Sequence, residues 1–247
     1  MKNFSFWVAE PLKLVCLGVI ASGGGLLVRY RNAKVNYTRK INFFALYLVP
    51  LLIDHLLPYD PAPVDVVLRS VFFMLFLVFF LEPVRERVPL AAIMFLSYDR
   101  PEDRPYTMLW LTTQLVAGYA VLIPMTWVFR RLDLGELMFI PVLVHGLGDG
   151  MAEPVGIRFG RHTYSTWALF SDRRYTRSLE GSACVLGVGL LAVITFHSSF
   201  TPPQLGAALL TVPMVMTLAE AFSPHTWDTP LMLLSGSLVL LAIVTWL

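Results

Sequence analysis

Residues 230–247 read PLMLLSGSLVLLAIVTWL, a continuous run without a charged side chain. A helix of roughly 17–25 mostly apolar residues is long enough to cross the hydrocarbon core of a bilayer. Seven other stretches have this character, at about 6–28, 41–58, 64–82, 107–129, 134–152, 178–196 and 204–222. The apolar run 88–96 is too short to cross and is expected to be interfacial or re-entrant. The sequence therefore predicts an all-α polytopic integral membrane protein with about eight transmembrane helices, forming one membrane domain over residues 1–247.

The overall composition points to the same class of protein. Hydrophobic residues make up 56% of the chain and charged residues 15%, with a mean hydropathy of +0.66. Soluble domains are about 45–50% apolar and about 25% charged, so composition favours a membrane protein. The net charge of +2 gives no reason to expect a nucleic-acid partner. Cys16 and Cys184 have neither metal-ligand nor redox-pair spacing and are interpreted as packing residues.

Basic residues are concentrated in three of the connections between the expected spans. Arginine and lysine are enriched in the cytoplasmic connections of membrane proteins. The odd-numbered connections are therefore expected to face the cytoplasm, with both termini outside, in an inner or plasma membrane. The residues are Arg29, Arg31, Lys34, Arg39 and Lys40 in the first connection, Arg85, Arg87, Arg100 and Arg104 in the third, and Arg158, Arg161, Arg173, Arg174 and Arg177 in the fifth.

Residues 145–160, HGLGDGMAEPVGIRFG, place carboxylates within a glycine-rich part of a membrane-length segment. A charge at membrane depth is costly and suggests a functional site, and Asp149 and Glu153 would share one helical face. Glycines leave backbone amides open to an anion, and Mg²⁺ prefers carboxylates together with phosphate oxygens. With Arg158 and Arg161 following, the segment suits a metal-bound polyphosphate. The alternative is that the glycines permit close helix packing and Asp149 is hydrogen-bonded in the bundle.

A second polar segment, Arg177-Ser-Leu-Glu-Gly181, stands immediately before an apolar run. Ser178 is a plausible helix cap, and Glu180 would lie in the first turn, where the helix dipole favours an acid. The free amides of such a helix start can also bind an anion. Ordinary capping is the alternative interpretation of this segment.

A third polar segment, residues 218–231, separates the last two expected spans. Glu220 lies in or at the edge of a span, where a carboxylate needs a partner or a wet cavity. Asp228 is in the following turn and precedes Thr229 and Pro230, a common start signal for a helix. His145, next to the glycine-rich segment, is expected to be a packed, hydrogen-bonded residue rather than a catalytic one.

Taken together, these segments resemble the membrane lipid-alcohol kinases, the group of dolichol kinase, phytol kinase and CTP-dependent diacylglycerol kinase. Phytol kinase-like members look nearest. The resemblance is good over roughly 145–182, fair at 218–231 and weak elsewhere. The group's Gly-Asp-x-x-Ala-x-x-x-Gly-x-x-x-Gly motif is matched by Gly148, Asp149, Ala152, Gly156 and Gly160, and its basic-Ser/Thr-x-Glu-Gly motif by Arg177, Ser178, Glu180 and Gly181. A late acidic pattern is matched in part by Glu220 and Asp228, and an early Arg-Lys-x-x-His by Arg39 and Lys40.

The resemblance implies phosphorylation of a long-chain isoprenoid or other lipid alcohol by a nucleoside triphosphate, CTP (or ATP), at the cytoplasmic membrane face. Mg²⁺ would be held by Asp149 and Asp228, and Glu180 or Glu220 would accept the hydroxyl proton or assist the metal. Phosphate-binding groups would come from Arg39, Lys40, Gly148, Gly156, Arg158, Gly160, Arg161, Arg177, Ser178 and Gly181. The expected partners are the lipid alcohol, the nucleotide and membrane lipids.

Three residues depart from the pattern of that group. Phe43 stands where the early histidine is expected, Thr229 replaces the late asparagine, and Arg177 replaces the usual lysine, keeping the charge but changing its geometry. These differences raise the question of changed specificity or lost activity. The alternatives are a phosphatidate cytidylyltransferase-like enzyme that makes a CDP-lipid, and a transporter that uses the intramembrane carboxylates for an ion or proton path.

Overall fold

The computed structural model describes residues 2–59, 63–169 and 171–247. About 81% of it is helical, which agrees with an all-α membrane protein. Four helices in the described residues are long and apolar enough to cross a membrane, over Ser5–Arg31, Thr107–Arg131, Pro202–Phe222 and Asp228–Trp246. These correspond to four of the eight expected spans. Contacts divide the chain into two compact units, Met1–Thr113 and Gln114–Leu247, which are described separately below as unit 1 and unit 2.

Unit 1 is built around the long helix α1, which packs against α2 and α5. The packing is so close that a Cβ added at Gly25 would lie 1.8 Å from the Ile93 carbonyl oxygen, so only glycine fits there. The expected span 64–82 is a shorter helix, α3, continued by the 3-10 turn η1. The elements are α1 (Lys2–Arg31), α2 (Val35–Leu56), α3 (Pro63–Phe76), η1 (Leu77–Phe80), α4 (Glu82–Arg87), α5 (Pro89–Leu96), η2 (Pro101–Asp103) and the start of α6 (Thr107–Arg131).

A network of ion-paired side chains lies among the apolar helices of unit 1. Lys13 on α1 is fully buried and donates to Glu10 Oε1 and to Asp54 Oδ1 of α2, each at 2.5 Å. Arg69 of α3 pairs with Glu10 Oε1 at 3.2 Å and with Asp54 Oδ2 at 3.3 Å, and the Tyr59 hydroxyl donates to Glu10 Oε1. Two acids thus balance two bases, as a low-dielectric interior requires.

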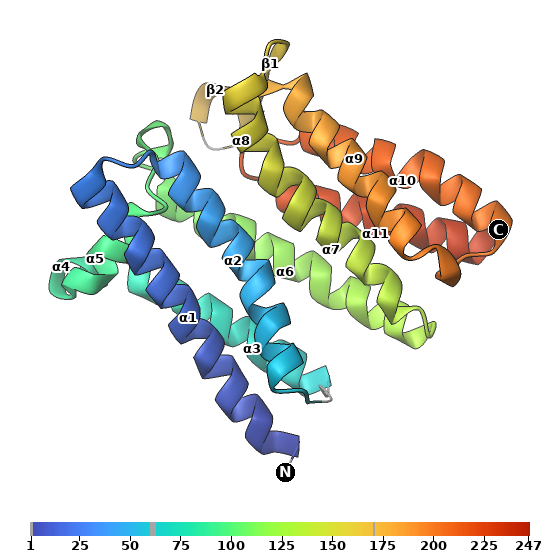
Figure 1. Cartoon of the computed structure of the whole chain (residues 1–247), viewed down its shortest axis with the longest axis horizontal. Coiled ribbons are helices and arrows are strands. Elements are labelled where there is room, and N and C mark those ends of the chain that lie inside the picture. Colours follow the sequence, from blue (N-terminus) through green and yellow to red (C-terminus); the bar gives the residue numbers. More distant parts are fainter. Residues whose placement is uncertain (1, 60–62, 170) are drawn as a thin grey trace. The chain divides into compact units, whose positions relative to one another are not determined.

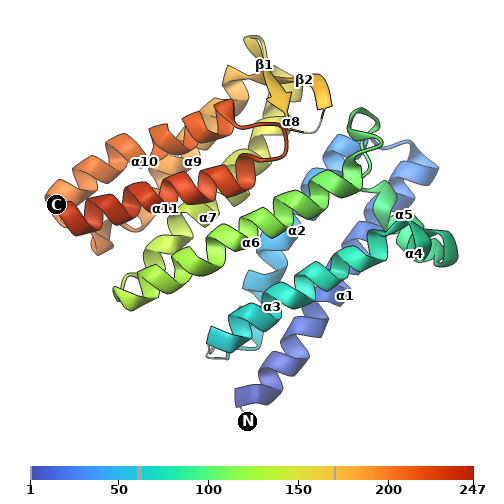
Figure 2. The same cartoon turned by 180° about the vertical axis from the view of Figure 1, so that it is seen from behind.

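Unit 2 contains three neighbouring long helices, with α10 packed between α9 and α11 (Figures 1 and 2). A two-stranded antiparallel sheet stands at one end of the unit, beside α8, and the carboxyl terminus lies at the other end. The elements after α6 are η3 (Gly135–Met138), α7 (Phe139–Leu143), the π-helix η4 (Val144–Asp149), α8 (Gly150–Phe159), β1 (Thr163–Ala168), β2 (Ser171–Ser178), α9 (Leu179–Thr195), η5 (His197–Ser199), α10 (Pro202–Phe222) and α11 (Asp228–Trp246).

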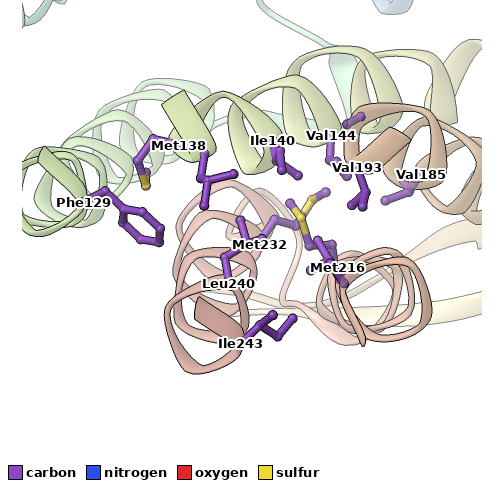
Figure 3. Packing of buried hydrophobic residues seen from close by; sticks show 14 of the residues in the cluster. Phe129, Met138, Ile140, Val144, Val185, Val193, Met216, Met232, Leu240 and Ile243 are labelled. Atoms are coloured by element: carbon purple, nitrogen blue, oxygen red, sulfur yellow. The ribbon is translucent and has the colours of Figure 1, made fainter. Parts of the chain in front are cut away.

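The apolar core of unit 2 lies where α7, η4, α9, α10 and α11 converge (Figure 3). Met216 of α10 and Met232 of α11 are fully buried at its centre, and Val144 of η4 and Val185 of α9 close one side. Unbranched methionine side chains fill irregular gaps of this kind. The core fixes η4 against the helices that carry the acidic residues discussed below.

The structure adds two features that the sequence analysis did not anticipate. The connection between residues 160 and 178, expected to be a basic loop, contains the β1–β2 hairpin with pairs from Thr163↔Ser178 to Ala168↔Ser171. Residues 145–159 of the glycine-rich segment are helical and pass from the π-helix η4 into α8. A π-helix turn inside a longer helix is often found at a functional site.

Candidate functional site

Three potential metal-ligating side chains come together in unit 2. Ligand atoms of His145, Asp149 and Asp228 lie within 4.8 Å of one another. His145 and Asp149 are buried, and Asp228 is half-buried. Asp149 and Asp228 were the two predicted metal ligands, and they are far apart in the sequence, so their approach is a product of the fold. His145 was expected to be a packing residue, and its position next to the glycine-rich segment was the only sequence signal for it.

The two elements that carry this group are tied together by Thr229. The Gln114 side-chain amide of α6 donates to Thr229 Oγ1 at 2.6 Å, and His145 Nε2 is 2.8 Å from the same oxygen. Thr229 follows Asp228 at the start of α11, so this contact fixes α11 against η4 and the first part of α6 within unit 2. Thr229, which departs from the pattern of the lipid-alcohol kinases, therefore contacts the ring of His145.

Arg177, near the end of β2, links the hairpin to both acids of the third segment. Its guanidinium donates to Glu220 Oε1 at 2.8 Å, to the Glu220 carbonyl oxygen, and to Asp228 Oδ2 at 3.2 Å. Burial lowers the pKa of Arg177, but the carboxylates of Asp228 and Glu220 outweigh that effect and raise its pKa. The guanidinium is therefore a fixed cation that orients Glu220 and Asp228.

A short hydrogen-bond chain ends on Glu220. Ser182 Oγ donates to Glu220 Oε2 at 2.8 Å, and the Tyr164 hydroxyl lies 2.7 Å from Ser182 Oγ. Because the single O–H of Ser182 donates to the Glu220 carboxylate, the Tyr164 hydroxyl is the donor in the second bond. Burial raises the pKa of Tyr164 and keeps the hydroxyl protonated. Neither residue was singled out in the sequence, where Ser182 offered only its position after the Glu-Gly pair.

The glycines of the site make close contact between helices α8 and α9. Ser178 caps α9 and accepts a hydrogen bond from the Gly181 amide at 3.1 Å. A Cβ at Gly156 would lie 2.8 Å from Ser178 Oγ, and one at Gly160 would lie 2.4 Å from the Gly156 carbonyl oxygen. A Cβ at Gly148 would lie 3.0 Å from Val185 Cα. These five predicted phosphate-binding residues thus lie where α9 and its capping residue meet η4 and the end of α8, and the Gly160 amide donates to the Gly156 carbonyl.

Replacing Gly181 with Ala should destabilise this contact. An added Cβ would lie 2.7 Å from the backbone oxygen of Ala152, which cannot move aside without shifting α8. Overpacking of this kind costs about 1–3 kcal/mol. Gly187 of the same helix has nothing within 4 Å of an added Cβ, so Gly187→Ala is the matched control and should be neutral or slightly stabilising. Thermal unfolding of the two purified variants measures the difference, and equal midpoints would contradict the packing argument.

Glu180 is engaged at the base of the hairpin. Its carboxylate accepts from the amides of Arg161 and His162 and lies 2.9 Å from His162 Nδ1. Its pKa is lowered to about 2, first by its own backbone amide and then by His162 and the Arg161 amide. A carboxylate with this pKa is a weak proton acceptor at neutral pH. Glu180 therefore anchors the hairpin to α9 and is poorly suited to the role of a base.

The remaining predicted cations are not among the residues that form the His145 group. Arg158 and Arg161, at the end of α8 and just after it, are exposed. Arg39 and Lys40 lie on α2 in unit 1, where the Lys40 ammonium is 5.0 Å from the centre of the Phe43 ring, so they are not part of the arrangement described for unit 2. The Arg177 guanidinium forms ion pairs with two of the predicted acidic site residues, Glu220 and Asp228.

Comparison of the chain with protein-family models, with curated proteins and with solved structures gave no match in any of the three cases. The candidate site is therefore described by its geometry alone. It consists of the His145 imidazole and the carboxylates of Asp149 and Asp228, whose ligand atoms converge, and Asp228 also contacts the partly buried Arg177–Glu220 ion pair.

Proposed function

We propose that the protein is a kinase that transfers a phosphoryl group from a nucleoside triphosphate, in the first place CTP, to the hydroxyl of a long-chain isoprenoid or other lipid alcohol. The observation that carries this proposal is the convergence of Asp149, Asp228 and His145 beside the Arg177–Glu220 pair. This group stands at the junction of two membrane-length apolar helices, α10 and α11. Phosphoryl transfer asks a protein mainly for positioning and for neutralisation of phosphate charge, and this group offers both.

The donor set fits a divalent cation. Two carboxylates suit Mg²⁺ together with phosphate oxygens, and the imidazole of His145 would also accept Mn²⁺. Asp149 and Asp228 would hold the ion, with His145 as a third donor. When bound, the ion would neutralise charge on the nucleotide phosphates. Since Arg177 already pairs with Asp228, it fixes the orientation of that carboxylate.

Glu220 fits the role of proton acceptor for the lipid hydroxyl better than Glu180 does. Glu180 is held by backbone amides and has its pKa lowered to about 2. Glu220 is buried, and its carboxylate accepts the last hydrogen bond of the Tyr164–Ser182 chain. A proton transferred to Glu220 would therefore arrive beside polar side chains in fixed positions. Arg158 at the end of α8 and Arg161 just after it are exposed, and their positive charge would attract an anionic nucleotide from a distance.

The lipid tail would lie along the apolar outer surface of the membrane helices. Leu218 and Phe222 at the site end of α10 are strongly exposed, as is Leu179 at the start of α9. Apolar side chains exposed on a membrane-spanning helix face hydrocarbon, and there an isoprenoid chain is soluble while its hydroxyl stays at the interface. We further propose that the chain crosses the membrane eight times. The distribution of basic residues favours a site on the cytoplasmic side.

Purified protein supplied with labelled CTP or ATP tests the proposal directly. Phytol, geranylgeraniol, dolichol and diacylglycerol are offered in turn, with Mg²⁺ or Mn²⁺, and the labelled lipid is identified. A lipid monophosphate is the expected product. A CDP-lipid cannot form from an alcohol, so phosphatidate is offered as well, and its conversion into a CDP-lipid with release of pyrophosphate would instead indicate a cytidylyltransferase. The absence of nucleotide turnover with the four alcohols and both metals would overturn the kinase assignment, and the absence of turnover with phosphatidate too would favour a transporter that uses the same carboxylates.

A further inference from the structure

The β1–β2 hairpin is bonded to the connection between two membrane-length helices. Thr166 Oγ1 of β1 donates to the Ser223 carbonyl oxygen at 2.8 Å, and the His225 amide donates to the Trp167 carbonyl oxygen at 2.7 Å. The His225 ring stacks on Tyr175 of β2 with centroids 3.5 Å apart and planes 5° apart. Ser223 and His225 lie between the end of α10 and the start of α11. The hairpin is therefore held at the adjoining ends of two helices that are long and apolar enough to cross a membrane.

The two faces of the hairpin differ in chemistry. Side chains alternate along a strand, and Thr166 and Arg177 point towards the α10–α11 end. The opposite face carries Ser165 and Trp167 on β1 and Arg174 on β2. The Trp167 side chain is 52% exposed, and Arg174 Nη1 reaches back across the pair to Ser165 Oγ at 3.5 Å. An indole and a guanidinium thus share the exposed face.

Residues beside this face add basic charge and apolar surface. Arg173 next to Arg174 is exposed, and Leu169 beyond Trp167 is 40% exposed. Tryptophan prefers the headgroup level of a bilayer, where its ring is half in hydrocarbon and its N–H can bond. Guanidinium groups bind phosphate oxygens with two parallel hydrogen bonds. This combination complements the phosphodiester of a lipid headgroup.

We propose that the exposed face of the hairpin that carries Trp167 and Arg174, together with the exposed Arg173 beside it, is a binding site for the headgroup of an anionic phospholipid. The indole would insert at the level of the headgroups while the guanidinium groups hold the phosphate. The lipid-binding proposal rests on the position of the hairpin and not on the proposed kinase activity, so each of the two proposals can be tested and rejected without the other. It gives the hairpin a second role, as a contact between the membrane surface and the strand that carries Arg177.

Native mass spectrometry of the full chain in detergent, titrated with phosphatidylglycerol or phosphatidylcholine, tests this site. Each basic residue near an anionic lipid surface contributes roughly fivefold in affinity. The double variant Arg173→Gln/Arg174→Gln should therefore bind phosphatidylglycerol about 25-fold more weakly and phosphatidylcholine unchanged. The matched control is Arg130→Gln/Arg131→Gln in the last turn of α6. There too, two successive arginines lie near a tryptophan, with Arg131 4.8 Å from the centre of the Trp127 ring.

A second measurement locates the lipid. Brominated phosphatidylglycerol should quench a component of the tryptophan emission that the Trp167→Phe variant lacks, whereas Trp127→Phe keeps it. Wild-type affinity in the hairpin double variant, or an equal loss in the Arg130/Arg131 control, would overturn the site. Displacement of the lipid by inorganic phosphate at equal concentration would also overturn it, because the site would then recognise a soluble anion. Circular dichroism of each variant confirms that it is folded.

Discussion

Asp149→Asn should reduce the proposed lipid-alcohol kinase activity by at least about 100-fold while leaving the fold intact. The two side chains have the same shape, but the amide lacks the charge that Asp149 contributes beside His145 and Asp228. A bound cation contributes several kcal/mol of transition-state stabilisation, and about 1.4 kcal/mol corresponds to a tenfold change in rate. Formation of labelled lipid phosphate from labelled CTP measures the loss, and the Mg²⁺ concentration for half-maximal rate should rise in any residual activity.

Asp133→Asn is the control for the same chemical change. Asp133 lies in an exposed turn after α6 with a positive φ of 57°, a conformation that asparagine also adopts readily. This variant should keep wild-type activity. If Asp149→Asn retained activity and metal dependence, Asp149 would not be a metal ligand, and the grouping with His145 and Asp228 would have a structural role only.

The second large effect is expected in unit 1, where Lys13→Met should lower the free energy of unfolding by about 3–5 kcal/mol. The substitution removes the fully buried ammonium between Glu10 and Asp54, and leaves Arg69 as the one cation that pairs with both acids in the described network. Breaking a buried ion pair is costly because the partner stays charged in a low-dielectric interior. Unfolding in mixed detergent micelles measures this change.

A double variant distinguishes electrostatics from lost packing. Lys13→Met with Glu10→Gln leaves one acid, Asp54, and one base, Arg69, so charge balance returns, and at least about 1 kcal/mol of stability should be recovered. Lys34→Met, at an exposed position before α2, should change stability by less than about 0.5 kcal/mol. A double variant as unstable as the sum of its single variants would show that the groups act independently.

The sequence was sufficient to predict the helices whose signal is local. The expected spans 107–129, 204–222 and 230–247 correspond closely to α6, α10 and α11, because a long apolar run has one favourable state in a membrane. Ser178 as a helix cap is confirmed by its bond to the Gly181 amide. The hairpin was missed because its alternating polar residues carry little hydrophobic pattern, and its stability comes from contacts with the distant Ser223 and His225.

The candidate site was predictable in its acids but not in their arrangement. Asp149, Glu220 and Asp228 attracted attention because carboxylates are costly near a membrane. No local pattern predicts that Arg177 pairs with both Glu220 and Asp228, because these contacts depend on how β2 packs against the ends of α10 and α11. His145 was expected to be a packing residue for the same reason: a lone histidine shows its role only when the fold supplies its neighbours.

The adjacency of Arg177 and Ser178 in β2 has a consequence for how the chain can vary. Successive strand residues point to opposite sides, so one of this pair meets the acids of α10 and α11 while the other caps α9. Insertion of a single residue into the paired part of β2 would reverse both directions and remove both contacts at once. Homologous sequences that keep the acidic site should therefore change the paired length of this hairpin in steps of two residues, and an alignment with frequent single-residue insertions there would show that the register is not constrained.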